Sequence, residues 1–203
     1  MRMRALQVVI MCKAPIPGKV KTRMVAAGMT PAEACALHRE MARAVIRRAA
    51  RLFPGRVTVA GSPAGHPFFA GIGLPVVDQG GGDLGGRMAR VARPLLEAGR
   101  PVLLLGTDAP HMAPERLQRA VAAADDHDAV VGPVEDGGYD LLLLTTPAAL
   151  ALLEGIDWGS DRVSSQTRAR AHARGLSLAW LEPGFDVDAP ADLARSRAAG
   201  WPE

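Results

Sequence analysis

Short apolar runs alternate along the chain with longer segments of helical periodicity. Seven runs rich in valine, leucine and isoleucine predict strands: ALQVVIMC, RVTVAG, LPVVDQ, PVLLLGT, DAVVGPV, YDLLLLTT and LSLAWL. Because most of these runs are apolar along their length, they predict a mainly parallel sheet covered on both faces by helices. The link DGGY between the fifth and sixth runs is too short for a crossover helix, so we expect a local departure from parallel order there.

Helical periodicity is clearest at residues 31–52. Thr30 precedes this segment as a capping residue, Pro31 takes its first position, and Glu33 completes a capping box. RMARVARPLLEAG predicts a helix between the third and fourth strands, with a kink expected at Pro94, and PERLQRAVAAA predicts one between the fourth and fifth. Since no repeat or linker interrupts the pattern, we expect one doubly wound domain over residues 1–203.

Composition excludes several classes of protein. The net charge of +3 comes from arginines spread along the helices, and only 4% of residues are aromatic, which disfavours nucleic acid as a partner. No apolar run is long enough to span a bilayer, and no small-residue cleavage site follows the first one, so we expect a cytoplasmic protein. Cys12 and Cys35 have neither metal-ligand nor disulfide spacing, and we expect both to be buried.

The lysines are concentrated in one place. Of 24 basic residues only Lys13, Lys19 and Lys21 are lysines, and they share the loop KAPIPGKVKTR with Arg23. An ammonium group is a compact partner for phosphate, so this loop predicts a polyphosphate site, with a solvated loop as the alternative. The GxxxxGK[ST] spacing is missing, which disfavours a P-loop ATPase or kinase.

A glycine-rich segment, DQGGGDLGGRM, follows the third predicted strand. In doubly wound sheets ligands bind at the carboxyl ends of strands, and here the glycines let the main chain approach a planar ligand while Gln79 offers an amide to a base edge. Gly80, Gly82 and Gly85 also fit GxGxxG. That match is weak because no acidic residue is placed for a ribose, so a dehydrogenase is a minor alternative and a flexible loop is another.

Carboxylates follow the fourth strand and precede the C terminus. Asp108 ends the apolar run in LLLGTDAP, and Asp186 and Asp188 lie in FDVDAPADL. Magnesium prefers one or two carboxylates together with phosphate oxygens, so these residues predict a divalent cation site. In an extended segment Asp186 and Asp188 alternate, and we expect only one of them to face the metal. The competing interpretation is that these aspartates cap turns or helices.

Six segments together carry a resemblance to a known family: KAPIPGKVKTRM, QGGGDLGGRM, LLLGTDAP, VVGPVEDGGYDLLLL, WGSDRVSSQT and DVDAPADL. In this order they resemble a bacterial family of glycosyltransferase-like proteins in the nucleotide-diphospho-sugar transferase superfamily, over essentially the whole chain. The chain is similar, more distantly, to 2-phospholactate guanylyltransferase, molybdenum cofactor guanylyltransferase and sugar-1-phosphate uridylyltransferases. The resemblance implies the GT-A fold, a Rossmann-like α/β/α sandwich.

The resemblance also implies roles for individual residues. It makes Lys21, Arg23, Asp108 and Asp136 catalytic candidates, and Asp108 with Asp186 or Asp188 the ligands of Mg²⁺ or Mn²⁺. The implied nucleotide-binding residues are Lys13, Lys21, Arg23, Gln79, Gly80, Gly85 and Arg87. The implied acceptor loop is Glu135, Asp136, Gly137, Gly138 and Tyr139, although the family often has an aromatic residue where this chain has Asp140.

Two reactions fit these residues. The resemblance favours glycosyl transfer from a nucleotide sugar to a small-molecule acceptor, and the lysine cluster suits the alternative, nucleotidyl transfer from a nucleoside triphosphate with release of pyrophosphate. A non-catalytic nucleotide-binding protein is a third interpretation. Glu135 or Asp136 is the candidate general base, unless both merely build the tight DGG turn. The oligomeric state stays open, with a homodimer as one option.

Overall fold

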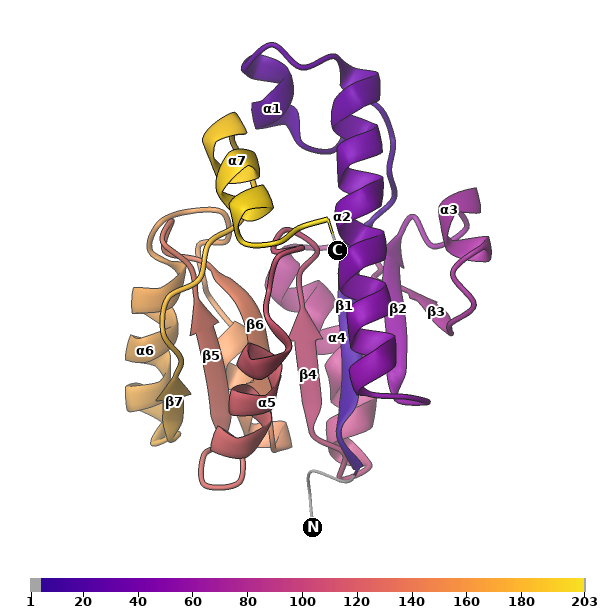
Figure 1. Ribbon diagram of the computed structural model, residues 1–203. Coiled ribbons are helices and arrows are strands. Elements are labelled where there is room, and N and C mark those ends of the chain that lie inside the picture. The colour runs from indigo at the N-terminus through magenta and orange to yellow at the C-terminus, as the bar shows by residue number, and fades with distance from the viewer. Residues whose placement is uncertain (1–4, 203) are drawn as a thin grey trace.

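A seven-stranded sheet forms the centre of the computed structural model, which describes residues 5–202. Its order is β3-β2-β1-β4-β6-β5-β7. The strands are β1 (Gln7–Lys13), β2 (Val57–Ser62), β3 (Val76–Asp78), β4 (Val102–Leu105), β5 (Ala129–Pro133), β6 (Tyr139–Leu144) and β7 (Leu178–Trp180). All seven predicted strands are confirmed, and so is the mainly parallel α/β sheet (Figure 1).

The predicted departure from parallel order lies at the β5–β6 link. Strand β6 pairs antiparallel with both β4 and β5, whereas the other pairs are parallel. Pro133 lies opposite Tyr139 across this hairpin. Because β6 is antiparallel to β4, its first residues lie at the sheet edge where β1 and β4 end. The hairpin therefore adds side chains to that edge.

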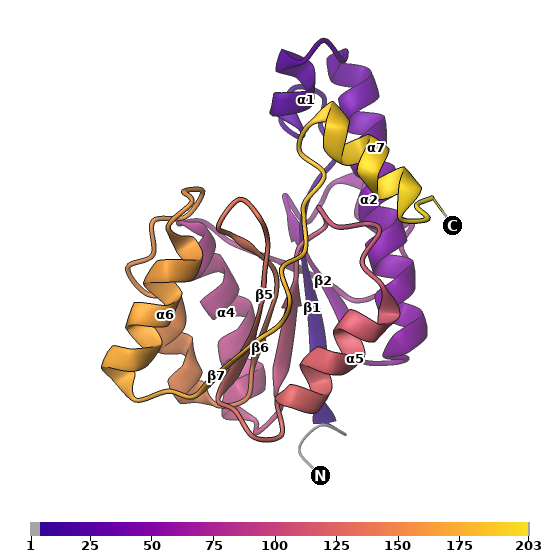
Figure 2. The ribbon, with the colours of Figure 1, turned by 60° about the vertical axis from the view of Figure 1, so that its left-hand side comes forward.

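Helices cover both faces of the sheet, as Figure 2 shows. They are α1 (Thr22–Ala26), α2 (Pro31–Leu52), α3 (Pro67–Ala70), α4 (Leu84–Glu97), α5 (Pro114–Ala123), the 3₁₀ helix η2 (Pro147–Leu153), α6 (Val163–Arg174) and α7 (Pro190–Ala198). The predicted capping box of α2 is present, since Thr30 Oγ1 accepts from the Glu33 N–H at 3.2 Å and Glu33 Oε2 accepts from the Thr30 N–H at 2.9 Å. Pro94 lies inside α4. None of the described helices is long and apolar enough to cross a membrane.

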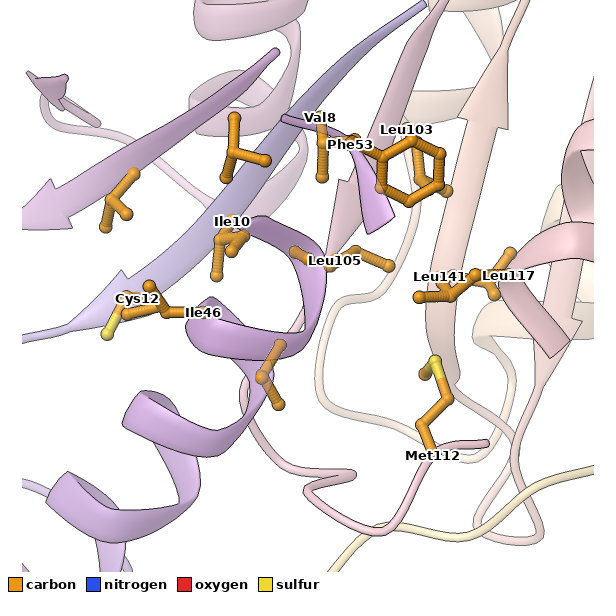
Figure 3. Packing of buried hydrophobic residues seen from close by; sticks show 14 of the residues in the cluster. Val8, Ile10, Cys12, Ile46, Phe53, Leu103, Leu105, Met112, Leu117 and Leu141 are labelled. Atoms are coloured by element: carbon orange, nitrogen blue, oxygen red, sulfur yellow. The ribbon is translucent and has the colours of Figure 1, made fainter. Parts of the chain in front are cut away.

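The two sheet faces carry separate cores. On one face Val8, Ile10, Leu103 and Leu105 pack with Ile46 and other residues of α2 and α5 (Figure 3). The opposite face packs against α4, η2 and α6. A third cluster joins α1, α2 and α7 through residues such as Met24, Met41, Val187 and Leu193. This cluster brings segments from opposite ends of the chain together above the sheet.

A buried ion pair joins α5 to the β5–β6 hairpin. Arg116 Nε donates to Asp140 Oδ2 at 2.9 Å, Nη2 donates to Asp140 Oδ1 at 3.1 Å, and Nη1 donates to the Glu182 carbonyl at 2.5 Å. Both side chains are buried. Burial raises the pKa of Asp140 to about 6 even beside Arg116, so the pair replaces the lost hydration incompletely.

This pair generates a stability prediction. Arg116→Met should lower the free energy of unfolding by about 3–5 kcal/mol, because it leaves the Asp140 carboxylate buried without its cation. The double variant Arg116→Met, Asp140→Leu should recover most of the loss, since both charges are then gone. Urea denaturation of the wild type and both variants measures this; equal losses in the single and double variants would contradict it.

Candidate active site

A cleft of about 910 Å³ opens at the sheet edge where β1 and β4 end. Its walls come from the loop after β1, the first turns of α4, the residues after β4, the β5–β6 hairpin, the loop before α6 and the segment before α7. This is the position where doubly wound folds bind ligands. Most of the residues singled out in the sequence meet here.

Lys21 lies at the centre of the polar contacts in this cleft. Its ammonium group is 2.5 Å from Asp108 Oδ1 and 3.1 Å from Asp188 Oδ1, and it donates to the Val187 carbonyl at 2.7 Å. Only 4% of the side chain is exposed. Burial alone would lower the pKa of Lys21, but the two carboxylates outweigh it and raise the pKa above its ordinary value. Lys21 is therefore a buried, charged ammonium group.

The backbone at Lys21 is also unusual. Lys21 has φ 48°, and it is the one non-glycine residue with positive φ among residues 5–202. For a residue with a Cβ the left-handed conformation costs about 1–2 kcal/mol. Such strain persists where the surrounding contacts fix it, and it is frequent at functional sites. Here the three contacts of the ammonium group fix it.

Both C-terminal aspartates line the cleft, so the premise that they alternate along an extended segment is wrong, while which of them faces a metal stays a prediction. Residues two apart on an extended segment point to the same side, so Asp186 and Asp188 share a face while Val187 between them is buried with α1 and α2. The Val187 N–H donates to the Asp108 carbonyl at 2.8 Å, which fixes this segment beside the end of β4. The α7 cap is supplied by Asp192, which accepts from the Asp188 and Ala189 N–H groups.

Negative charge is concentrated around Asp186. Removal from water, together with the nearby carboxylates of Asp108, Asp140, Asp188 and Asp136, raises the pKa of Asp186 to about 8. At Asp108 desolvation acts in the same direction, but the Lys21 ammonium outweighs it and the pKa falls below its ordinary value. Lys21 thus compensates Asp108, whereas Asp186 lies in an excess of negative charge.

This arrangement fits a divalent cation. No cluster of three or more candidate metal-ligating side chains occurs in the described part of the chain, so the protein does not supply a complete cage. Magnesium does not need one, because it binds through one or two carboxylates plus substrate phosphates and water. Asp108 and Asp186, with Asp188 beside them, are the residues that would hold it, and the cation would offset the charge excess at Asp186.

The other predicted cations also reach the cleft. Lys13 and Lys19 are exposed and line it. Arg23 Nη1 lies 3.0 Å from Asp188 Oδ2, and Arg87 on α4 donates from Nε to the Gly82 carbonyl at 2.9 Å. The structure therefore brings all three lysines and both arginines to one cavity, as a polyphosphate site requires.

The glycine-rich segment is more structural than the sequence indicated. Gln79 lines the cleft but is buried, and its amide donates to the Ala60 carbonyl at 2.7 Å and to the Cys12 carbonyl at 3.3 Å. Its N–H groups are therefore engaged by β1 and β2. Gly80, with φ 71°, lies against the Arg90 guanidinium, and a Cβ there would be 2.5 Å from Arg90 Nη1.

Gly85 has a packing role. A Cβ at this position would meet the Leu153 carbonyl oxygen and would lie 2.6 Å from Trp158 Nε1. Gly85 is buried and is not among the residues that line the cleft. The glycine lets α4 approach η2 and the loop before α6 closely.

The predicted acceptor loop is divided by the structure. Glu135 forms a bidentate pair with Arg195 of α7 at 2.7 Å for both contacts, and it is not among the residues that line the cleft. Asp136 and Gly138 do line it, and Asp136 Oδ1 accepts from the Gly138 N–H at 3.0 Å. Gly137 has φ 88°. The tight DGG turn and a cleft-facing carboxylate therefore coexist.

Sequence reasoning missed one wall of the cleft. Trp158, Ser160 and Asp161, from the loop before α6, line it together with Tyr139. The Tyr139 and Trp158 rings meet edge to face with centroids 5.9 Å apart. The sequence signal was the WGSDRVSSQT segment, which contributed to the family resemblance but received no role in the site.

A model of a bacterial protein family, described as "Uncharacterized protein conserved in bacteria (DUF2064)", matches residues 45–160. The chain belongs to this family. No curated protein matches the DUF2064 chain. Among solved structures, it is similar to a "putative nucleotide-diphospho-sugar transferase" from Desulfovibrio desulfuricans G20, with 28% identity, a TM-score of 0.81, and coverage of 93% of this chain and 84% of that one.

More distant structures show the same fold. A nucleotidyl transferase from Methanothermobacter thermautotroptrophicus is 16% identical, with a TM-score of 0.67 and coverage of 96% of each chain. A 4-diphosphocytidyl-2C-methyl-D-erythritol synthase is 13% identical, with a TM-score of 0.61 and coverage of 96% and 97%. These likenesses confirm the predicted nucleotide-diphospho-sugar transferase fold of the DUF2064 chain.

The packing of Gly85 generates a prediction. Gly85→Ala should lower the free energy of unfolding by about 1–3 kcal/mol, because the added methyl group overlaps Leu153 and Trp158. Gly81→Ala is the matched control, since a Cβ there meets nothing within 4 Å. Denaturant unfolding of both variants tests this; a Gly85→Ala variant as stable as Gly81→Ala would contradict the packing role.

Proposed function

We propose that this DUF2064 protein is a metal-dependent transferase that binds the phosphates of a nucleotide-activated donor. One observation carries the proposal: cations and carboxylates from six segments, distant in sequence, meet in one cleft at the ligand-binding edge of the fold. A solvated loop would not bury Lys21 against two carboxylates. The fold is shared with nucleotide-using transferases, which supports the same substrate class.

The cleft has two chemically different sides. In the sheet order β4 lies between β1 and β6, so Asp108 separates the lysines that follow β1 from the side chains near β6. The first side carries Lys13, Lys19 and Lys21. The second side presents aromatic, hydroxyl and carboxylate groups, and its lining residues are Asp136, Gly138, Tyr139, Asp140, Trp158, Gly159, Ser160, Asp161 and Val163. We assign the donor phosphates to the first side and the acceptor to the second.

This division favours glycosyl transfer. None of the described lining residues between 134 and 163 is a lysine or arginine. A phosphorylated acceptor would therefore meet Asp136 and Asp161 without a cation of its own, which is electrostatically unfavourable. A hydroxyl group of an uncharged acceptor meets no such penalty, and a carboxylate is the group that would accept its proton.

In the proposed reaction the acceptor hydroxyl attacks the anomeric carbon of the sugar, and the bond from that carbon to the diphosphate oxygen breaks. Asp136 accepts the hydroxyl proton, while Lys21 and Arg23 stabilise the charge on the departing nucleoside diphosphate. A divalent cation bound by Asp108 and Asp186 would supply further neutralisation of the diphosphate. Tyr139 and Trp158 offer apolar surface beside the acceptor.

Nucleotidyl transfer is the second candidate. The specific observation in its favour is the number of cations, because all three lysines, Arg23 and Arg87 suit the larger charge of a triphosphate. In that reaction a phosphate oxygen of the acceptor attacks the α-phosphorus of the nucleoside triphosphate, and pyrophosphate departs. The protein groups would stabilise the leaving pyrophosphate instead of a nucleoside diphosphate.

Product analysis distinguishes the two reactions. The protein is incubated with magnesium and either nucleotide sugars plus unphosphorylated sugars and polyols, or nucleoside triphosphates plus phosphorylated sugars and acids. Glycosyl transfer predicts release of nucleoside diphosphate from the first mixtures only. Release of pyrophosphate from the second mixtures would assign nucleotidyl transfer, and no turnover in either would contradict both.

The metal site generates a prediction for binding. In the wild type, magnesium should increase the affinity for a nucleoside diphosphate, and in Asp108→Asn this increase should disappear because one of the two ligating carboxylates is lost. Calorimetric titration of the common nucleoside diphosphates, with and without magnesium, measures it. Asp125→Asn, an exposed aspartate outside the cleft, is the control. Equal metal dependence in Asp108→Asn and the wild type would contradict the assignment.

The divided loop predicts different effects for two neighbouring carboxylates. Asp136→Asn keeps the hydrogen bond to Gly138 but removes the base, so kcat should fall by about 10²–10⁴. Glu135→Gln should leave kcat close to wild type, because it removes only an exposed ion pair with Arg195 outside the cleft. Steady-state kinetics of both variants measures kcat. A larger fall in Glu135→Gln than in Asp136→Asn would identify Glu135, and not Asp136, as the base.

A further inference from the structure

Lys21 differs from the other cations of the cleft in its partners. Lys13 and Lys19 are exposed and the Arg23 side chain is 68% exposed, whereas the Lys21 side chain is 4% exposed. Lys21 also touches Asp108, one of the two carboxylates that the proposed function assigns to the metal, at 2.5 Å, and the neighbouring Asp188 at 3.1 Å. Its ammonium group thus occupies a position beside Asp108 for which a metal ion would compete.

The two cations would compete for the same oxygen atoms. A magnesium ion binds carboxylate oxygens at about 2.0–2.1 Å, so an ion on Asp108 Oδ1 would lie close to the Lys21 Nζ. At such distances two positive charges repel each other strongly, even at the effective dielectric of a protein surface. Asp108 therefore binds a divalent cation only weakly while it is paired with Lys21.

A phosphate group offers Lys21 another partner. The cleft is lined by further cations that attract the same anion, and Arg23 reaches Asp188 from the exposed side. If the ammonium moves from the carboxylates to a phosphate, Asp108 becomes free for the metal and Asp188 keeps its contact with Arg23. The exchange keeps the buried Lys21 ammonium group paired, which is the condition for burying it.

We infer that Lys21 is a built-in cation that neutralises the metal-binding carboxylate of Asp108 in the ligand-free protein and releases it when the donor diphosphate binds. This inference rests on the proposed function and adds an order to it: metal binds weakly alone and tightly together with the diphosphate. The coupling prevents a divalent cation from occupying the cleft without substrate. By linkage, metal and diphosphate then increase the affinity of the protein for each other.

Manganese affinity in the absence of nucleotide tests this directly. Free Mn²⁺ is measured by electron paramagnetic resonance while wild type, Lys21→Met and Lys19→Met are titrated without nucleotide. Lys21→Met should bind Mn²⁺ more tightly than wild type by a factor on the order of 10 to 100, within the usual range of ligand coupling. Lys19→Met should stay close to wild type, although it removes the same charge from the same cleft.

Two further measurements show whether a change in Mn²⁺ affinity comes from a folding defect. Circular dichroism and thermal melting establish that each variant is folded, and Mn²⁺ should raise the melting temperature of Lys21→Met more than that of the wild type. Lys21→Gln removes the charge but keeps an N–H donor for the Val187 carbonyl. It replaces Lys21→Met if that variant does not fold, and the same increase in Mn²⁺ affinity is expected.

The outcomes separate this inference from the proposed function. If Lys21→Met binds Mn²⁺ no more tightly than wild type, or if Lys19→Met shows the same increase in Mn²⁺ affinity, Lys21 does not control metal binding. The inference is then wrong, whereas the proposed metal-dependent transfer is not affected. If no variant binds Mn²⁺, and nucleoside diphosphates do not promote its binding to wild type, the metal site itself is wrong. Tighter binding in Lys21→Met alone supports the inference.

Discussion

The contact of one ammonium group with two carboxylates holds the cleft together. Lys21 comes from the loop after the first strand, Asp108 from the end of β4, and Asp188 from the segment before the last helix. The third core cluster, in which Val187 packs with residues of α1 and α2, brings the first and last of these segments together, and the bond from the Val187 N–H to the Asp108 carbonyl adds the second. The left-handed backbone of Lys21 shows that its position is imposed by this assembly and not by local preference. Without the Lys21 ammonium group, Asp108 and Asp188 would lose the cation that they share.

The sequence predicted the sheet and the end of the sheet that carries chemistry. Continuous apolar runs specify buried parallel strands, and the short DGGY link specifies the hairpin, because both are local properties of the chain. The same locality explains the cleft: polar residues that directly follow buried strands must lie at one edge. The sequence alone therefore predicts that the loop carrying Lys21 and the Asp108 carboxylate lie at the same end of the sheet.

What the sequence could not show is which partner each polar side chain takes. Glu135 and Asp136 are adjacent acidic residues with equal claims to catalysis, yet Glu135 pairs with Arg195, a residue 60 positions away. Gln79 resembled a base-reading amide, but its N–H groups bind carbonyls of β1 and β2. Such choices depend on distances between segments that are far apart in the chain. The error over Asp186 and Asp188 was different, since extended geometry already places residues two apart on one face.

Asp140 shows how a buried structural pair influences the site in front of it. A Cβ at Gly132 would lie 2.5 Å from Asp140 Oδ1, and one at Gly184 would lie 2.9 Å from Asp140 Oδ2, so both glycines make room for the pair with Arg116. An aromatic side chain in place of Asp140 would leave Arg116 without its carboxylate, so these positions must change together. The Asp140 carboxylate also contributes to the raised pKa of Asp186. An ion pair that packs the hairpin against α5 therefore adds to the negative charge that a divalent cation would offset in the cleft.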